Sequence, residues 1–231
     1  MNNYNRHIEM LTMVAEALGA DLCSQTAFVG GTITGLIMTD DFSREQVRYT
    51  NDVDLIVHIM SMSSYHKLQE ELRYRGFSEN MTADAPMCAM WLQGIRVDLM
   101  PDDEGILGFS NRWYKDALKT AEDFKLTEEL SIRVIRPDYF IATKLEAYLG
   151  RGYSSPIASS DIEDIVNVFD GRKELLVEIE QAPEELRKYI AEQLSVLLTN
   201  SEFEYVVQNC AMNNIRREQM LFERIQGASN V

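Results

Sequence analysis

The stretch that decides the fold is Asp52-Val53-Asp54-Leu55-Ile56-Val57-His58-Ile59. Its β-branched and apolar residues are typical of a buried β-strand. Successive side chains of a strand point to opposite faces of the sheet, so Asp52 and Asp54 project from the same face. The sequence therefore predicts a core strand that carries two neighbouring carboxylates at its leading end.

Two carboxylates placed in this way repel each other unless a cation lies between them. Mg²⁺ is commonly held by one or two carboxylates together with substrate phosphates, and Mn²⁺ suits the same oxygen ligands. Asp52 and Asp54 are therefore candidate metal ligands. The structural alternative is that one acid caps a turn and the other is solvated.

A glycine turn precedes this strand. Thr26-Ala27-Phe28-Val29 is strand-like and runs into Gly30-Gly31-Thr32, after which residues 33–38 are expected to start a helix. Such a turn exposes backbone N–H groups that can hold a phosphate chain, and glycine lets phosphate approach the backbone closely. Gly30, Gly31 and Thr32 thus predict the phosphate-binding half of a nucleoside triphosphate·Mg²⁺ site, with a plain turn as the alternative.

A third acid, Asp98, interrupts the apolar strand pattern of Ile95-Arg96-Val97-Asp98-Leu99-Met100. A buried carboxylate without a partner is costly. If this strand lies beside the first one, Asp98 can complete the metal cluster and help to deprotonate an attacking hydroxyl. Otherwise Asp98 pairs with Arg96 or is exposed before Pro101.

The rest of the chain alternates between strand and helix patterns and then becomes helical. A helix is expected from His7 to Leu18, ended by Gly19, and a tight turn is expected at Gln93-Gly94. We predict an α+β fold. An N-terminal domain, residues 1–136, would hold a small mixed sheet flanked by helices, and residues 137–231 would form a helical bundle.

Composition and charge exclude several classes of protein. Hydrophobic residues make up 45%, which is typical of a globular chain. A formal charge of −15 disfavours broad binding of DNA or of anionic membranes. We find no run of about 18 apolar residues and no apolar leader segment, so we expect a cytoplasmic protein without a membrane partner. The spacing of cysteine and histidine does not favour zinc.

A second set of charged residues lies in the helical half. Lys144 and Arg151 fall near one side of a predicted helix, where a cation could reach triphosphate oxygens. The alternatives are a solvated Lys144 and an Arg151 that pairs with Glu146 or caps the helix C-terminus. Asp161 and Asp164 share a helix face and could position Lys144, contact ribose, or only place charge near a helix N-terminus.

In this order the signals resemble the polymerase β type nucleotidyltransferase superfamily, and more narrowly the AbiEii-type toxin family of type IV toxin–antitoxin systems. That family has a glycine pair, an R-x-[ST]-x-D-x-D-L run, a K-L-x-A-x-x-x-R segment and a D-x-x-D pair. The matching residues are Gly30-Gly31, Arg48-Tyr49-Thr50-Asn51-Asp52-Val53-Asp54-Leu55, Lys144-Leu145-Glu146-Ala147 with Arg151, and Asp161 with Asp164.

The resemblance implies a metal-dependent transferase that moves a nucleoside monophosphate from a nucleoside triphosphate to an acceptor hydroxyl and releases pyrophosphate. Asp52, Asp54 and Asp98 would hold Mg²⁺ or Mn²⁺, and Lys144 would neutralise the departing pyrophosphate. The nucleotide, in a cleft between the domains, would be bound by Gly30, Gly31, Thr32, Arg48, Thr50, Arg151, Asp161 and Asp164.

The acceptor is open at this point. The resemblance implies tRNA or another RNA, with an antitoxin protein as a partner, but the charge of −15 leaves a large RNA-binding face hard to place. A small cationic molecule of the aminoglycoside type is the alternative acceptor, and a non-catalytic binding module is the alternative function. The loops between Gly31 and Asp52 and between Arg151 and Asp161 are longer than the family's compact versions.

Overall fold

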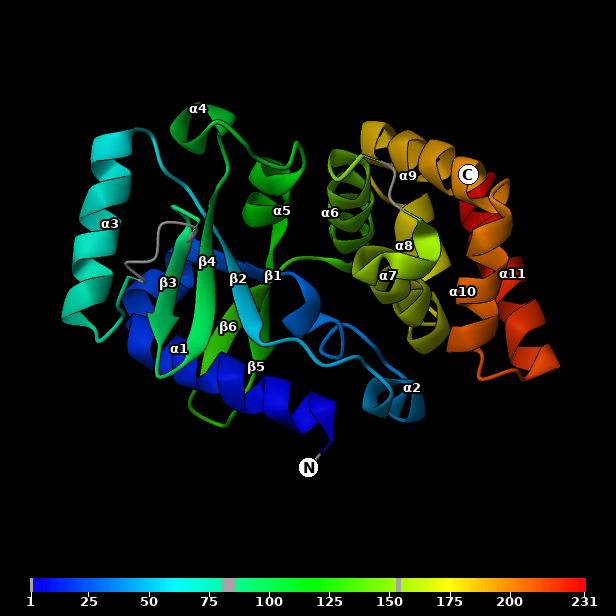
Figure 1. The fold of residues 1–231 in the computed structure, drawn as a ribbon, viewed down its shortest axis with the longest axis horizontal. Helices are drawn as coiled ribbons and strands as arrows, with labels where there is room; N and C mark the ends of the chain where they lie inside the picture. Colours follow the sequence, from blue (N-terminus) through cyan, green and yellow to red (C-terminus); the bar gives the residue numbers. More distant parts are fainter. Residues whose placement is uncertain (1, 80–85, 153–154) are drawn as a thin grey trace. The chain divides into compact units, whose positions relative to one another are not determined.

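The computed structural model describes residues 2–79, 86–152 and 155–231. These residues form an α+β fold with an open mixed sheet, so the predicted fold class is confirmed (Figure 1). Contacts divide the chain into two compact units, which are described separately below. Unit 1 comprises Met1–Ile33 and Tyr49–Arg136, and unit 2 comprises Thr34–Arg48 and Pro137–Val231. The domain roles expected of residues 1–136 and 137–231 stay predictions.

The sheet lies entirely in unit 1. Its strands are β1 Thr26–Val29, β2 Asp52–Val57, β3 Ala89–Leu92, β4 Ile95–Pro101, β5 Glu122–Lys125 and β6 Ser131–Val134. Their spatial order is β3-β4-β2-β1-β6-β5. The pairs β2–β4 and β1–β6 are parallel, and the other neighbours are antiparallel. The strand that opens with two acids is therefore central in the sheet.

Burial explains why β2 and β1 occupy this central position. Leu55 and Phe28 are register partners and have no exposed surface, so one face of both strands is packed against the core. Gln93 and Gly94 both have positive φ values, of 50° and 88°, and join β3 to β4, which confirms the predicted tight turn. The edge strand β5 was not predicted from the sequence, because its residues are mostly exposed and charged and so lack an apolar strand pattern.

Helices flank the sheet within unit 1. They are α1 Asn3–Gln25, the 3₁₀ turn η1 Gly31–Ile33, α3 Met62–Tyr74, α4 Glu104–Leu107 and α5 Tyr114–Thr120. Figure 1 shows α1 running along the sheet, against which it packs through buried residues such as Leu11, Val14 and Leu18. The hydroxyl of Tyr65 in α3 donates to the Leu99 carbonyl of β4 over 3.2 Å. This bond ties α3 to the sheet.

Of two helix predictions for unit 1, one is confirmed and one is wrong. The predicted end at Gly19 is confirmed, because Gly19 has non-helical dihedral angles, φ 69° and ψ 167°, and a second helical segment follows it within α1. Residues 33–38 do not start a helix, because only the three-residue turn η1 follows Gly30. The glycine pair permits a sharp turn, but the helix propensity of the residues that follow was not sufficient to extend this turn into a helix.

Unit 2 is helical. Its elements are α2 Asp41–Glu45, α6 Pro137–Gly150, η2 Pro156–Ala158, α7 Ser160–Gly171, α8 Leu175–Glu180, α9 Glu184–Leu198, α10 Ser201–Cys210 and α11 Ile215–Ser229. The long loop expected between Gly31 and Asp52 contains α2, whose N-cap Asp40 accepts a bond from the Ser43 amide. The N-cap of α7 is Ser159, whose side chain accepts a bond from the Ile162 amide.

The core of unit 2 is built around α6, which is buried on nearly every side. Phe140 of α6, Phe169 of α7 and Leu194 of α9 are at most 1% exposed. Within the described residues, every helix is too short or too polar to cross a bilayer.

The packing of α9 can be tested with two substitutions on the same helix. Leu194→Ala should lower the free energy of unfolding by about 2–5 kcal/mol, because it opens a cavity in the core. Val196, two residues away, is 53% exposed, so Val196→Ala should change it by less than about 0.5 kcal/mol. Urea denaturation of both variants measures the difference, and equal losses would contradict this packing.

Candidate active site

The register of β2 and β4 brings the three predicted acids together in unit 1. Asp52 lies opposite Arg96, and Asp54 lies opposite Asp98. Residues paired in this way share a face of the sheet, and so do residues two apart on one strand. Asp52, Asp54 and Asp98 therefore lie on one face, which we call the carboxylate face, and Arg96 lies among them.

Arg96 binds Asp98 through a two-pronged ion pair. Its Nε donates to Asp98 Oδ1 over 2.8 Å, and its Nη2 donates to Oδ2 over 2.6 Å. The Asp98 side chain is 9% exposed and that of Arg96 is 37% exposed. Burial raises the pKa of Asp98, Arg96 opposes this shift, and the charge of Asp52 adds to it. The pairing with Arg96, one of the alternatives for Asp98, is thus present.

The two predicted threonines hold Asp52 in place. The Thr50 hydroxyl donates a short hydrogen bond to Asp52 Oδ1. The Thr32 hydroxyl donates to the backbone carbonyl of Asp52 over 2.5 Å. The Thr50 amide in turn donates to Nε2 of the buried His7 over 3.2 Å. The Thr50 hydroxyl therefore positions the Asp52 carboxylate, and the Thr32 hydroxyl holds the Asp52 backbone.

Gly30 lies directly against Asp54. Its φ is +82°, and a Cβ at this position would lie 1.8 Å from Asp54 Oδ2. Only glycine can take this conformation and leave room for the carboxylate. Gly31 is buried and begins the turn η1. The close approach of Gly30 to Asp54 therefore joins the glycine turn to the carboxylate face.

The predicted charged residues of unit 2 form a separate cluster. Lys144 Nζ donates to Asp161 Oδ1 over 3.2 Å and to Asp164 Oδ2 over 2.7 Å. The Arg48 guanidinium grips both oxygens of Asp164 at 2.9 and 2.8 Å, and Arg151 pairs with Asp161. The acids thus hold Lys144, which is one of the roles considered for them.

This cluster, which we call the lysine cluster, is largely buried. The side chains of Lys144, Asp161 and Asp164 are at most 9% exposed, so the network is shielded from water. Glu146, considered as the partner of Arg151, instead accepts a bond of 2.6 Å from the Tyr189 hydroxyl. The predicted site residues therefore form two groups, one within each unit.

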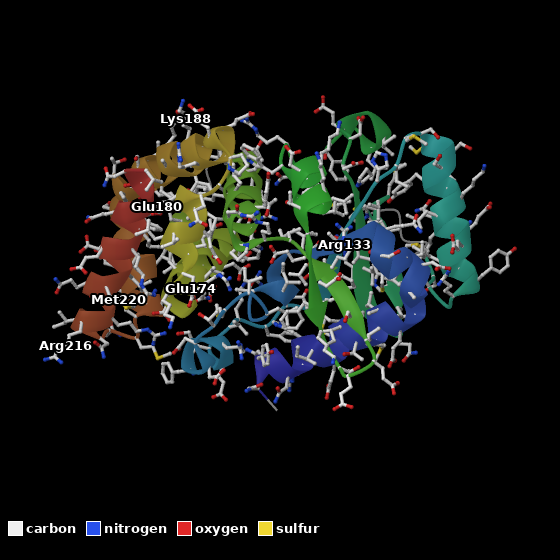
Figure 2. The ribbon with its side chains drawn as sticks, turned by 180° about the vertical axis from the view of Figure 1, so that it is seen from behind. Arg133, Glu174, Glu180, Lys188, Arg216 and Met220 are labelled. Carbon is white, nitrogen blue, oxygen red and sulfur yellow. The ribbon has the colours of Figure 1, made fainter. Side chains whose placement is uncertain are left out.

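A cavity of about 650 Å³ lies within unit 2, and no predicted site residue lines it. Glu174 and Met220, labelled in Figure 2, are part of its wall. So are Asp170, Arg217 and Phe42; Arg217 pairs with Asp170 and lies 5.2 Å from the centre of the Phe42 ring. The sequence analysis missed these residues because no short motif links positions so far apart in the chain.

The acids of the carboxylate face can be compared with the ligands that a metal ion requires. Among the residues that the structure describes, no three His, Cys, Asp or Glu side chains are grouped so that they could hold a metal ion. Asp98 contributes both oxygens to Arg96, so a metal ion would be held by Asp52 and Asp54. Two carboxylates completed by substrate phosphates are a sufficient donor set for Mg²⁺.

No protein-family model and no curated protein matches the sequence. The likeness to nucleotidyltransferases therefore depends on the motifs and stays a prediction.

The contact between Gly30 and Asp54 can be tested with a matched pair of glycines. Gly94→Ala, at φ +88° with open space around the new methyl group, should cost about 1–2 kcal/mol of folding free energy. Gly30→Ala carries the same backbone strain and also displaces Asp54, so it should cost about 3 kcal/mol or more. Chemical denaturation compares them, and equal costs would mean that the Asp54 contact is unimportant.

The lysine cluster can be tested by removing one cation. Lys144→Met should lower the free energy of unfolding by about 3 kcal/mol, because the buried Asp161 and Asp164 both lose an ion pair with Lys144. Each of these acids keeps one arginine partner, Arg151 for Asp161 and Arg48 for Asp164. Lys188, labelled in Figure 2, pairs with Glu184 on the surface, so Lys188→Met should leave the unfolding free energy almost unchanged. Urea midpoints measure both, and a small effect for Lys144→Met would indicate that the cluster contributes little to stability.

Proposed function

We propose that this protein is a metal-dependent nucleotidyltransferase, which transfers a nucleoside monophosphate from a nucleoside triphosphate to an acceptor hydroxyl and releases pyrophosphate. The observation that carries the proposal is the carboxylate face. Asp52 and Asp54 of β2 share one face of the sheet with Asp98 of the adjacent parallel strand β4, next to a glycine turn. A scaffold has no need to crowd three acids, because like charges in one place destabilise it.

Asp52 and Asp54 would hold the divalent cation, Mg²⁺ or Mn²⁺, and Asp98 would join them once its pairing with Arg96 is broken. The bound cation would neutralise phosphate charge and make the acceptor hydroxyl more acidic. Thr50 supports this role because its hydroxyl fixes one Asp52 oxygen and thereby orients the carboxylate. Backbone N–H groups of Gly30, Gly31 and Thr32 would bind phosphate oxygens.

Asp98 would accept the proton of the acceptor hydroxyl. Its position opposite Asp54, on the face that carries the proposed metal ligands, supports this role.

Lys144 is kept as the residue predicted to neutralise the departing pyrophosphate. Two of its three N–H groups donate hydrogen bonds to Asp161 and Asp164. The third has no hydrogen-bond partner among the described residues and is the donor that this role requires. Arg48, Arg151, Asp161 and Asp164 would then fix the position of Lys144.

The acceptor is proposed to be either RNA, such as tRNA, or a small molecule. An RNA acceptor would accord with a toxin that is neutralised by an antitoxin protein. The charge of −15 favours a small cationic acceptor, because an RNA would have to be bound by a local basic patch on an acidic protein.

The proposal is tested by supplying each α-labelled nucleoside triphosphate with Mg²⁺ or Mn²⁺ and either total RNA or a metabolite extract. The wild-type protein should label one fraction. Asp54→Ala should reduce labelling at least about a hundredfold, because the cation loses a ligand. Asp123→Ala, which removes an exposed acid of β5, should label normally. Labelling by Asp54→Ala equal to wild type would reject the assignment.

A non-catalytic module on the same fold is distinguished by ligand-induced stabilisation. A nucleotide-binding site predicts that nucleoside triphosphate raises the melting temperature, and that it does so only when Mg²⁺ is present. A wild-type protein that shows no such increase and labels neither fraction would favour the binding module.

A further inference from the structure

We infer that Arg96 is the resident counter-cation of the carboxylate face, and that a divalent cation gains Asp98 as a ligand only when Arg96 moves from Asp98 to a phosphate of the incoming nucleotide. This regulatory role for Arg96, which rests on the proposed nucleotidyltransferase function, would make metal binding and nucleotide binding depend on each other.

The first step is the competition for Asp98. The Arg96 fork occupies both carboxylate oxygens, at 2.8 and 2.6 Å, and Arg96 is the only partner of Asp98 among the described residues. A metal ligand must offer the same lone pairs to the cation. A guanidinium and a divalent ion also repel each other at such short range. In this geometry Asp98 can therefore bind either Arg96 or the metal, but not both.

The second step is the position of Arg96 within the carboxylate face. It lies opposite Asp52 in the β2–β4 register and two residues before Asp98 on the same face. Its positive charge therefore compensates more than one acid. Without a metal, this arginine lowers the repulsion among the acids that the sheet brings together.

The third step is the destination of the released side chain. Arg96 is 37% exposed, whereas Asp98 is 9% exposed, so the guanidinium can turn outward without crossing the core. Arg96 lies at the end of β4 that is beside the start of β2, where Thr32 and Thr50 contact Asp52. The guanidinium would therefore turn outward at this edge of the sheet. A guanidinium fork fits phosphate oxygens as well as a carboxylate. A nucleotide phosphate at this edge would therefore stabilise the released state.

The two exchanges predict coupled binding. A nucleotide that attracts Arg96 frees Asp98 for the metal, and a metal that takes Asp98 frees Arg96 for the nucleotide. Because coupling free energies are reciprocal, each ligand should raise the affinity for the other. Wild-type protein should accordingly bind Mn²⁺ weakly alone and more tightly when nucleoside triphosphate is present.

The experiment measures Mn²⁺ binding by electron paramagnetic resonance for the full chain, with and without a non-hydrolysable nucleoside triphosphate. Arg96→Gln should bind Mn²⁺ about tenfold more tightly than wild type in the absence of nucleotide. A change of this size is expected when the charge-assisted Arg96–Asp98 pair no longer competes with the metal. Arg73→Gln is the matched control, because it removes the same charge from α3, where Arg73 pairs with Glu79. Its Mn²⁺ affinity should equal that of wild type.

Two further variants keep the test decisive. Asp54→Asn in the Arg96→Gln background should abolish the gain, which assigns the bound Mn²⁺ to the carboxylate face. Arg96→Lys keeps the charge but loses the fork, so its nucleotide-free affinity should lie between those of wild type and Arg96→Gln. If Arg96→Gln is unstable, Mn²⁺ should raise its melting temperature more than that of wild type.

The outcomes separate the inference from the function on which it rests. If wild type binds Mn²⁺ in the presence of nucleotide, while Arg96→Gln binds Mn²⁺ alone no more tightly than Arg73→Gln, the role of Arg96 is overturned and the proposed function stands. If neither wild type nor Arg96→Gln binds Mn²⁺ under any condition, the proposed function fails together with the role of Arg96.

Discussion

The parallel pairing of β2 with β4 is the constraint on which the candidate site depends. It sets Asp54 opposite Asp98 and Asp52 opposite Arg96, and so places these four side chains on one face of the sheet. A shift of one residue would turn these side chains to the other face, where Val53, Leu55 and Val57 are buried. The apolar residues of β2 therefore fix the geometry of the charged ones.

Much of the sheet could be predicted because its signals are local. The period-two placement of Asp52 and Asp54 and the Gln93-Gly94 turn depend on neighbouring residues, and the structure contains both features. Gly19 ends the first helical segment of α1 as expected, whereas the helix expected after Gly31 is absent. Glycine was correctly associated with unusual backbone geometry in both places, but whether a helix follows the glycine depended on tertiary packing that a single segment does not encode.

The candidate site was predictable in its residue types and less so in its pairings. Asp98 was expected beside the other acids or with Arg96, and it is in both places, because Arg96 lies on the same face. Asp161 and Asp164 were expected near Lys144, but the grip of Arg48 on Asp164 joins residues too far apart in the chain for spacing rules to anticipate. Charge pairs between distant segments follow from the fold and cannot be read from local pattern.

The membership of Thr34–Arg48 in unit 2 has a topological consequence. The backbone passes from one unit to the other three times, after Ile33, after Arg48 and after Arg136, so neither unit is a continuous piece of polypeptide. If the chain were cut after Arg136, Arg48 and Asp164 would lie on different fragments. Asp164 would then lose its ion pair with the Arg48 guanidinium. A single cut after Arg136 therefore does not separate the two units, and the ribosome synthesises all strands of the sheet before the helices against which residues 34–48 pack.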